Sequence, residues 1–198
     1  MPSKNLSKIK EVFLRVDRAN FLPPSQKDLA HLDQALPLGY GQSISQPSVV
    51  YLMLLLLKVQ PGQKILDVGS GSGWTTAMLS WLTGEEGEVW ALEIIPALKK
   101  IGEKNLAGCS AIKLEKIHSL LGDGSRGYPP AAPFDRILVS ASAEKIPSVL
   151  KDQLKSGGRM VIPVRNNLDL VIKKGEKNFE VISYPGFSFV PLRVNSKL

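Results

Sequence analysis

The chain has 198 residues, enough for one domain with a full hydrophobic core. Its single cysteine, Cys109, excludes intramolecular disulfides, iron–sulfur clusters and cysteine-rich zinc sites, and with only two histidines we expect no metal site. The net charge of +7 makes nucleic acid a candidate partner, but the lysines are dispersed and no arginine-rich run accompanies them, which favours a solvated basic surface.

No targeting or membrane segment is expected from the sequence. Residues 1–10 are polar and basic, which does not fit a signal peptide. The most apolar run, residues 49–57, is too short to cross a bilayer. We therefore expect a cytoplasmic protein with no membrane partner.

The first predicted element is an amphipathic helix over residues 7–18. Four apolar side chains share one face of it at helical spacing, namely Ile9, Val12, Phe13 and Val16. Pro23 and Pro24 cannot continue the helix, and the polar stretch 25–34 that follows has no clear structure.

Residues 36–47 combine two glycines, two prolines and small hydroxyl side chains, which predicts an ordered loop. Pro47 opens the next helix, predicted over residues 48–58, which is apolar nearly all round and should be buried. Ser45 just before it has two interpretations. Its hydroxyl either caps the helix or is held at the helix start, facing a cofactor cleft.

The stretch 64–74 organises the chain. A short apolar run ends in Asp67 and is followed by glycines at alternate positions, which indicates a buried strand, a tight turn and a helix over residues 74–82. The spacing is GxGxG, so neither the dinucleotide fingerprint GxGxxG nor a phosphate-binding P-loop fits. An acid before GxGxG resembles class I S-adenosylmethionine methyltransferases.

Two further acids follow predicted strands. The strand 88–92 ends at Glu93, in the place where a carboxylate accepts both hydroxyls of a ribose. A helix over residues 96–106 and a third strand within 111–121 lead to Asp123 in a Gly-Asp-Gly turn. That carboxylate either accepts from an adenine amine or belongs to a turn without a ligand.

The rest of the chain completes an α/β pattern. The fourth strand with its lead-in covers residues 132–140, and a helix over 147–154 is expected to be capped by the glycines at 157 and 158. Short strands are then predicted over residues 168–173, 179–184 and 187–192.

Here a resemblance becomes specific. Residues 37–47, Pro-Leu-Gly-Tyr-Gly-Gln-Ser-Ile-Ser-Gln-Pro, resemble the loop of protein-L-isoaspartate O-methyltransferases that carries the active-site serine, and Ser45 occupies that position. The chain departs from the family at Gln46, usually alanine, and at Ser48, usually histidine. Residues 132–139 and 189–192 also resemble the family, so the likeness extends from the first helix onward.

The resemblance implies a cofactor, a substrate and a set of site residues. The cofactor is S-adenosyl-L-methionine, with S-adenosyl-L-homocysteine as product, and the substrate is the α-carboxylate of L-isoaspartyl residues in damaged proteins and peptides. The methyl ester then closes to a succinimide, whose hydrolysis returns some normal aspartate. Ser45 is implied as catalytic, and the cofactor contacts are Gln42, Ser43, Ile44, Asp67, Gly69, Ser70, Gly71, Ser72, Gly73, Glu93, Asp123 and Gly124.

The sequence also bears on which group accepts the methyl group. A carboxylate is already ionised at pH 7 and needs placement more than a base. Residues 140–143, Ser-Ala-Ser-Ala, offer no carboxylate or amide for an exocyclic amine, and Cys109 lies far from the expected cleft, against pyrimidine methylation. Two alternatives stay open: an RNA methyltransferase of similar core, favoured by the basic charge, and a cofactor-binding relative without catalysis, suggested by Ser48.

We therefore predict a Rossmann-like three-layer α/β/α sandwich of the class I methyltransferase type, with a mostly parallel sheet. One domain should span residues 1–198. It would comprise N-terminal helices and the active-site loop (1–60), a cofactor-binding core (61–165) and C-terminal strands (166–198). We expect a monomer that binds isoaspartyl peptides and no specific nucleic acid.

Overall fold

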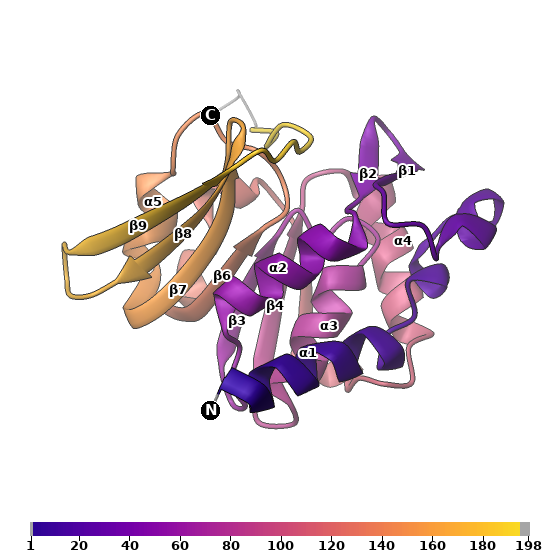
Figure 1. Cartoon of the computed structure of the whole chain (residues 1–198), viewed down its shortest axis with the longest axis horizontal. Coiled ribbons are helices and arrows are strands. Elements are labelled where there is room, and N and C mark those ends of the chain that lie inside the picture. The colour runs from indigo at the N-terminus through magenta and orange to yellow at the C-terminus, as the bar shows by residue number, and fades with distance from the viewer. Residues whose placement is uncertain (1, 195–198) are drawn as a thin grey trace.

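The computed structural model describes residues 2–194, with side chains from residue 6 onward, and its centre is one seven-stranded sheet (Figure 1). The strand order is β5–β4–β3–β6–β7–β8–β9. Five neighbouring strands are parallel: β3 (Lys64–Val68), β4 (Glu88–Glu93), β5 (Ile117–Leu121), β6 (Phe134–Val139) and β7 (Leu154–Val164). The antiparallel strands β8 (Asn167–Lys173) and β9 (Phe179–Pro185) extend the sheet beyond β7. This arrangement confirms the predicted Rossmann-like, mostly parallel fold.

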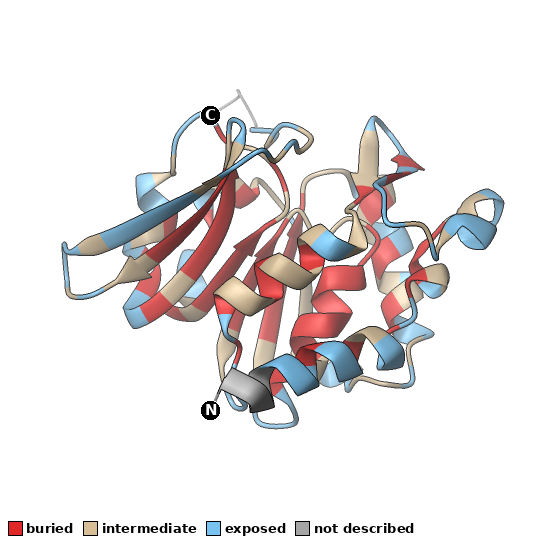
Figure 2. Cartoon of the chain, viewed as in Figure 1, coloured by how far each residue is buried: buried red, intermediate tan, exposed pale blue. Residues whose placement is uncertain are grey.

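The two faces of the sheet are covered unequally. One face packs against α1 (Pro2–Arg15), α2 (Pro47–Leu57), α3 (Trp74–Thr83) and α4 (Pro96–Ala107), and the other against the short α5 (Ser148–Asp152) and nearby turns. Side chains alternate between the two cores along each strand, as the pleat requires, so Ile65 faces α1–α4 and Leu66 faces α5. The central strands β3, β4 and β6 are buried along most of their length, whereas the edge strand β5 is half-buried and β9 is largely exposed (Figure 2).

The N-terminal segment differs from the prediction in three places. Helix α1 ends at Arg15 rather than at residue 18, because the Asp17 carboxylate accepts the N–H of Ala19 and starts a 3-10 turn at Arg18–Phe21. A second 3-10 turn, Pro24–Leu29, forms where no structure was predicted. The loop predicted over residues 36–47 is a small hairpin of β1 (Leu36–Gly39) and β2 (Gln42–Ile44).

Two predictions for the C-terminal third were wrong. The glycines at 157 and 158 do not cap a helix: α5 ends at Asp152, and both lie inside β7, where its register against β6 shifts. A Cβ at Gly158 would stand 3.0 Å from the carbonyl oxygen of Asp135, so the irregular strand needs glycine there. Residues 187–192 form no regular strand; Pro191 makes only an isolated bridge to Ser142.

Helix α2 is less buried than its composition suggested. One face is fully covered, through Val50, Met53, Leu54 and Leu57, while its other apolar side chains are half-buried. Two arginines of the sheet hold its C-terminal end. Arg136 donates to the carbonyl of Lys58 at 3.0 and 3.1 Å, and Arg159 donates to that of Leu56 at 2.7 Å. Burial and the nearby Arg159 charge lower the pKa of Arg136 to about 10.

The carboxyl ends of the parallel strands meet at one edge, where open α/β sheets bind their ligands. Gly69, Glu93, Gly122 and Ser140 all lie there, at the end of β3, β4, β5 and β6 or just after it. The N-terminal end of α2, which follows Ser45, faces the same edge. Within residues 2–194, no helix has the length and apolar character to cross a membrane.

Candidate active site

The turn between β3 and α3 has the backbone that its glycines predicted. Gly69, Gly71 and Gly73 have φ angles of 77°, 53° and 88°, a left-handed conformation that other residues rarely adopt. Helix α4 packs directly on this turn: a Cβ at Gly102 would stand 2.9 Å from the carbonyl oxygen of Gly71. Asn105 of the same helix donates to the carbonyl of Ser72 at 3.0 Å, which fixes the turn from outside.

Asp67 lies behind the turn rather than on a pocket wall. Its side chain is fully buried, and one carboxylate oxygen accepts the hydroxyls of Thr75 and Thr76 at 3.1 and 2.6 Å. Burial raises the pKa of Asp67 to about 6, and the Glu93 charge adds to that rise, while the two threonines oppose it. The acid therefore fixes the start of α3, through which it can shape the glycine turn.

Glu93 links the ends of two strands. One carboxylate oxygen accepts the N–H of Gly71 and the other that of Ile95, each at 2.9 Å. The residue is only 5% exposed, yet it lines the pocket described below. Each carboxylate oxygen has a second lone pair, so the group can still accept from a ligand hydroxyl.

Asp123 is engaged within its own turn. One carboxylate oxygen accepts both the N–H and the hydroxyl of Ser125, at 3.0 and 2.7 Å. Its flanking glycines, Gly122 and Gly124, line the pocket, and Asp123 itself does not. A Cβ at Gly124 would stand 2.4 Å from a Val68 methyl group, so this turn packs tightly on the end of β3.

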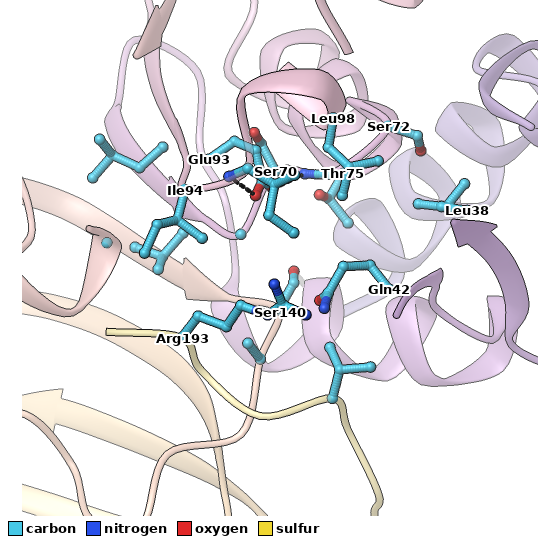
Figure 3. Close-up of a pocket in the computed structure, with 18 of the residues that line it drawn as sticks. Leu38, Gln42, Ser70, Ser72, Thr75, Glu93, Ile94, Leu98, Ser140 and Arg193 are labelled. Atoms are coloured by element: carbon cyan, nitrogen blue, oxygen red, sulfur yellow. Dashed lines mark hydrogen bonds between the residues drawn. The ribbon is translucent and has the colours of Figure 1, made fainter. Parts of the chain in front are cut away.

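These elements enclose a pocket, here called the glycine-loop pocket (Figure 3). Most predicted site residues line it: Gln42, Ser43, Ile44, Ser45, Gly69, Ser70, Gly71, Ser72, Glu93 and Gly124. The three predicted residues outside its wall are Asp67, Gly73 and Asp123. Apolar side chains also line it, among them Leu38, Leu92, Ile94, Ile95 and Leu98.

A second hollow adjoins the first and is here called the serine pocket. It contains four serines, Ser43, Ser45, Ser140 and Ser188, beside the apolar Val49, Phe189 and Val190. Ser43, Ser45, Ser140 and Val190 line both pockets. The Ser45 hydroxyl has no hydrogen-bond partner within the described part of the chain. Ser45 thus stands between the two compartments.

Asp33, rather than Ser45, caps the N-terminal end of α2. Asp33 accepts the N–H of Ser48 at 2.8 Å and the side-chain amide of Gln46 at 3.1 Å. Gln46 also donates to the Ser48 hydroxyl at 3.0 Å. These bonds lower the pKa of Asp33, the backbone bond from Ser48 contributing most. The two residues that depart from the family pattern, Gln46 and Ser48, therefore join Asp33 in holding the loop.

Sequence reasoning missed three contributors to the site. Ser140 lines both pockets, and its hydroxyl is buried without a partner among the described residues. Arg193 lines the glycine-loop pocket from the C-terminal segment, and Arg18 donates to the carbonyl of Ser45 at 3.1 Å. The position of Ser140 directly after a predicted strand could have indicated a site residue, whereas the sequence around Arg18 and Arg193 contains no such pattern.

Comparison with known sequences finds one family along nearly the whole chain. The family described as protein-L-isoaspartate(D-aspartate) O-methyltransferase matches residues 4–197. A protein-L-isoaspartate O-methyltransferase from Pyrococcus abyssi is 40% identical over 189 residues, covering 93% of this chain and 85% of the relative. One of the same name from Methanopyrus kandleri is 42% identical over 190 residues, covering 94% and 83%.

Solved structures agree on the fold. A Plasmodium falciparum protein-L-isoaspartate O-methyltransferase in complex with S-adenosyl-L-homocysteine superposes with a TM-score of 0.86 at 24% identity, over 95% of this chain and 91% of that one. Another protein-L-isoaspartate O-methyltransferase gives a TM-score of 0.85 at 25% identity, over 98% and 67%.

Proposed function

Because this chain belongs to the protein-L-isoaspartate(D-aspartate) O-methyltransferase family, we propose that its glycine-loop pocket holds the cofactor and its serine pocket the acceptor, with Ser45 between them. The enzyme uses S-adenosyl-L-methionine to methylate the α-carboxylate of L-isoaspartyl residues in damaged proteins and peptides. The observation that carries the site assignment is the wall shared by the two pockets, on which Ser45 lies.

The glycine-loop pocket suits a nucleoside with a cationic arm. Glu93 would accept the ribose hydroxyls, and the apolar Ile94, Ile95 and Leu98 beside Gly122 and Gly124 would flank the adenine. The carboxylates of Asp67 and Glu93 give this end of the sheet a negative potential, which favours a positively charged ligand. We propose that Asp67, Gly73 and Asp123 support the pocket from behind rather than touch the cofactor.

The bound cofactor supplies a methyl group on a positively charged sulfur. The acceptor carboxylate is ionised at neutral pH because its ordinary pKa is about 4, so the protein needs to place it and has no proton to remove. The Ser45 hydroxyl can donate to one carboxylate oxygen and leave the other to react. Ser140, buried and without a partner among the described residues, is a second donor at the same wall. Alignment of this kind accounts for much of the rate that enzymes gain in displacement reactions.

The test is methyl incorporation into a matched pair of peptides. We expect label from tritiated S-adenosyl-L-methionine to enter a peptide with one L-isoaspartyl residue and not its isomer with normal aspartate. A chain that binds the cofactor but labels neither peptide would instead be the catalytically inactive relative that Ser48 suggested.

We also propose that the enzyme is a monomer and binds no specific nucleic acid. The support is the dispersion of its lysines in the sequence, which predicts weak, salt-sensitive RNA binding. Light scattering on the purified chain tests the first statement. Stoichiometric methylation of tRNA or rRNA would contradict the second statement and favour the alternative that the chain is an RNA methyltransferase.

A further inference from the structure

The two pockets contain very few charged groups. Among the described residues that line them, only Glu93 and Arg193 are charged. Glu93 accepts a backbone N–H with each carboxylate oxygen. Arg193 donates one N–H, to the carbonyl of Tyr40 at 3.1 Å, and no carboxylate in residues 6–194 lies within ion-pair distance of it. A guanidinium has five N–H donors, so most of its capacity is available to a ligand.

The position of Arg193 is fixed from both ends. The chain just before it is pinned to the segment after β6, because the N–H of Ser142 donates to Val190 and that of Leu192 donates to Ser142, each at 2.8 Å. Its guanidinium is tied to the turn of the β1–β2 hairpin at Tyr40, an exposed residue. Figure 3 shows the side chain reaching from the C-terminal segment toward Gln42. Arg193 thus stands at the exposed rim of the glycine-loop pocket.

A guanidinium at this place is suited to a carboxylate, which it can bind through two parallel hydrogen bonds. The reacting carboxylate is a poor partner for it. That group loses its negative charge as it accepts the methyl group, so a cation on it would stabilise the ground state more than the transition state. A carboxylate that keeps its charge throughout the reaction has no such penalty.

We propose that Arg193 forms a carboxylate subsite for the substrate and selects isoaspartyl peptides that carry an acidic residue beside the reacting one. The inference rests on the proposed function and adds a substrate preference to it. Arg193 lines the glycine-loop pocket, but the same segment supplies Ser188 and Phe189 to the serine pocket and Val190 to both. A peptide that extends from the serine pocket along this segment would reach Arg193. A charge at an exposed rim acts mainly on association and apparent affinity, and its effect weakens with salt.

The test uses isoaspartyl hexapeptides that differ in one residue, placed at each of the two positions before and after the isoaspartyl residue. Glutamate, glutamine and lysine are compared there. For the wild type, kcat/KM should be about two- to fivefold higher with glutamate than with glutamine at one position, the range of an exposed ion pair, and lower with lysine. The preference should shrink in high salt.

Arg193→Gln should bring the glutamate-to-glutamine ratio to about one, and Arg193→Lys should keep part of it. The matched control is Arg15→Gln, which removes the same charge from an exposed helix position and should retain the ratio. A wild type that methylates all peptides equally, or an Arg193→Gln enzyme that keeps the preference, would overturn the subsite. So would an Arg193→Gln enzyme with unchanged peptide ratios and a weakened calorimetric Kd for the cofactor. A wild type that methylates no isoaspartyl peptide contradicts the proposed function itself.

Discussion

Arg18 donates a hydrogen bond to the carbonyl oxygen of Ser45 at 3.1 Å, across 27 positions of sequence. The same guanidinium donates to the carbonyls of Ala30, Leu32 and Gln34, and it lies 5.5 Å from the centre of the Trp74 ring. Arg18 is only 5% exposed. One buried cation thus ties the active-site loop to the N-terminal segment and to the first residue of α3.

We predict that Arg18→Lys lowers kcat by about ten- to a hundredfold, because an ammonium cannot reach four carbonyls and a small displacement of a catalytic group is costly. Circular dichroism should show a retained fold with a lowered Tm. The decisive measurement is a double-mutant cycle with Ser45→Ala. If Arg18 acts by positioning Ser45, Arg18→Lys should lower kcat little further in the Ser45→Ala enzyme. Arg15→Lys serves as the exposed control.

Glu93→Ala should weaken cofactor binding by about 1–3 kcal/mol, the cost of leaving ligand hydroxyls without their acceptor. Calorimetric titration with S-adenosyl-L-homocysteine measures this directly. Glu88→Ala, at the opposite end of the same strand, is the control and should bind normally. Unchanged affinity in Glu93→Ala would remove the ribose role from this acid.

Asp67 should make the stability of the fold depend on pH. Its folded-state pKa of about 6 lies above its ordinary value of 3.8, so folding favours the protonated acid. Its stabilising contribution is complete below about pH 4 and is lost as the pH rises through 6, amounting to at most about 3 kcal/mol at 1.4 kcal/mol per pKa unit.

Relative to Asp67→Asn, which cannot titrate, the wild type should lose free energy of unfolding between pH 4 and 7 in urea denaturation. The exposed Asp152→Asn is the control and should follow the wild type. If wild type and Asp67→Asn change in parallel with pH, Asp67 has an ordinary pKa in the folded protein.

The parts of the molecule that the sequence predicted well are those set by local patterns. The glycine turn, the strand before it and the position of Glu93 follow from residue types over short stretches. The failures depend on partners far away in sequence. The local pattern at Gly157 and Gly158 predicts a helix cap. The two glycines instead lie in β7, where the chain passes close to the carbonyl oxygen of Asp135. Likewise, nothing near residue 33 shows that its carboxylate caps α2, because Ser48 is 15 positions away.

Ser45→Ala is the prediction that tests the mechanism. The structure assigns the cap of α2 to Asp33 and leaves the Ser45 hydroxyl without a partner in the described residues, so its removal should leave Tm and most cofactor affinity intact. Asp33→Ala, by contrast, should lower the Tm, because the N–H of Ser48 loses its cap. Differential scanning calorimetry on the two variants separates a cap from a catalytic group.

The kcat of Ser45→Ala, unlike its Tm, should fall. No base is needed for an ionised acceptor, so the Ser45 hydroxyl contributes by aligning it, and the loss of an orienting donor lowers kcat by roughly ten- to a thousandfold. Ser45→Thr keeps the hydroxyl and should be milder. The measurement is kcat and KM on an isoaspartyl peptide at saturating cofactor. A wild-type kcat in Ser45→Ala would transfer the aligning role to Ser140, one of the two other serines on the shared wall, and Ser140→Ala would then show the loss expected here for Ser45.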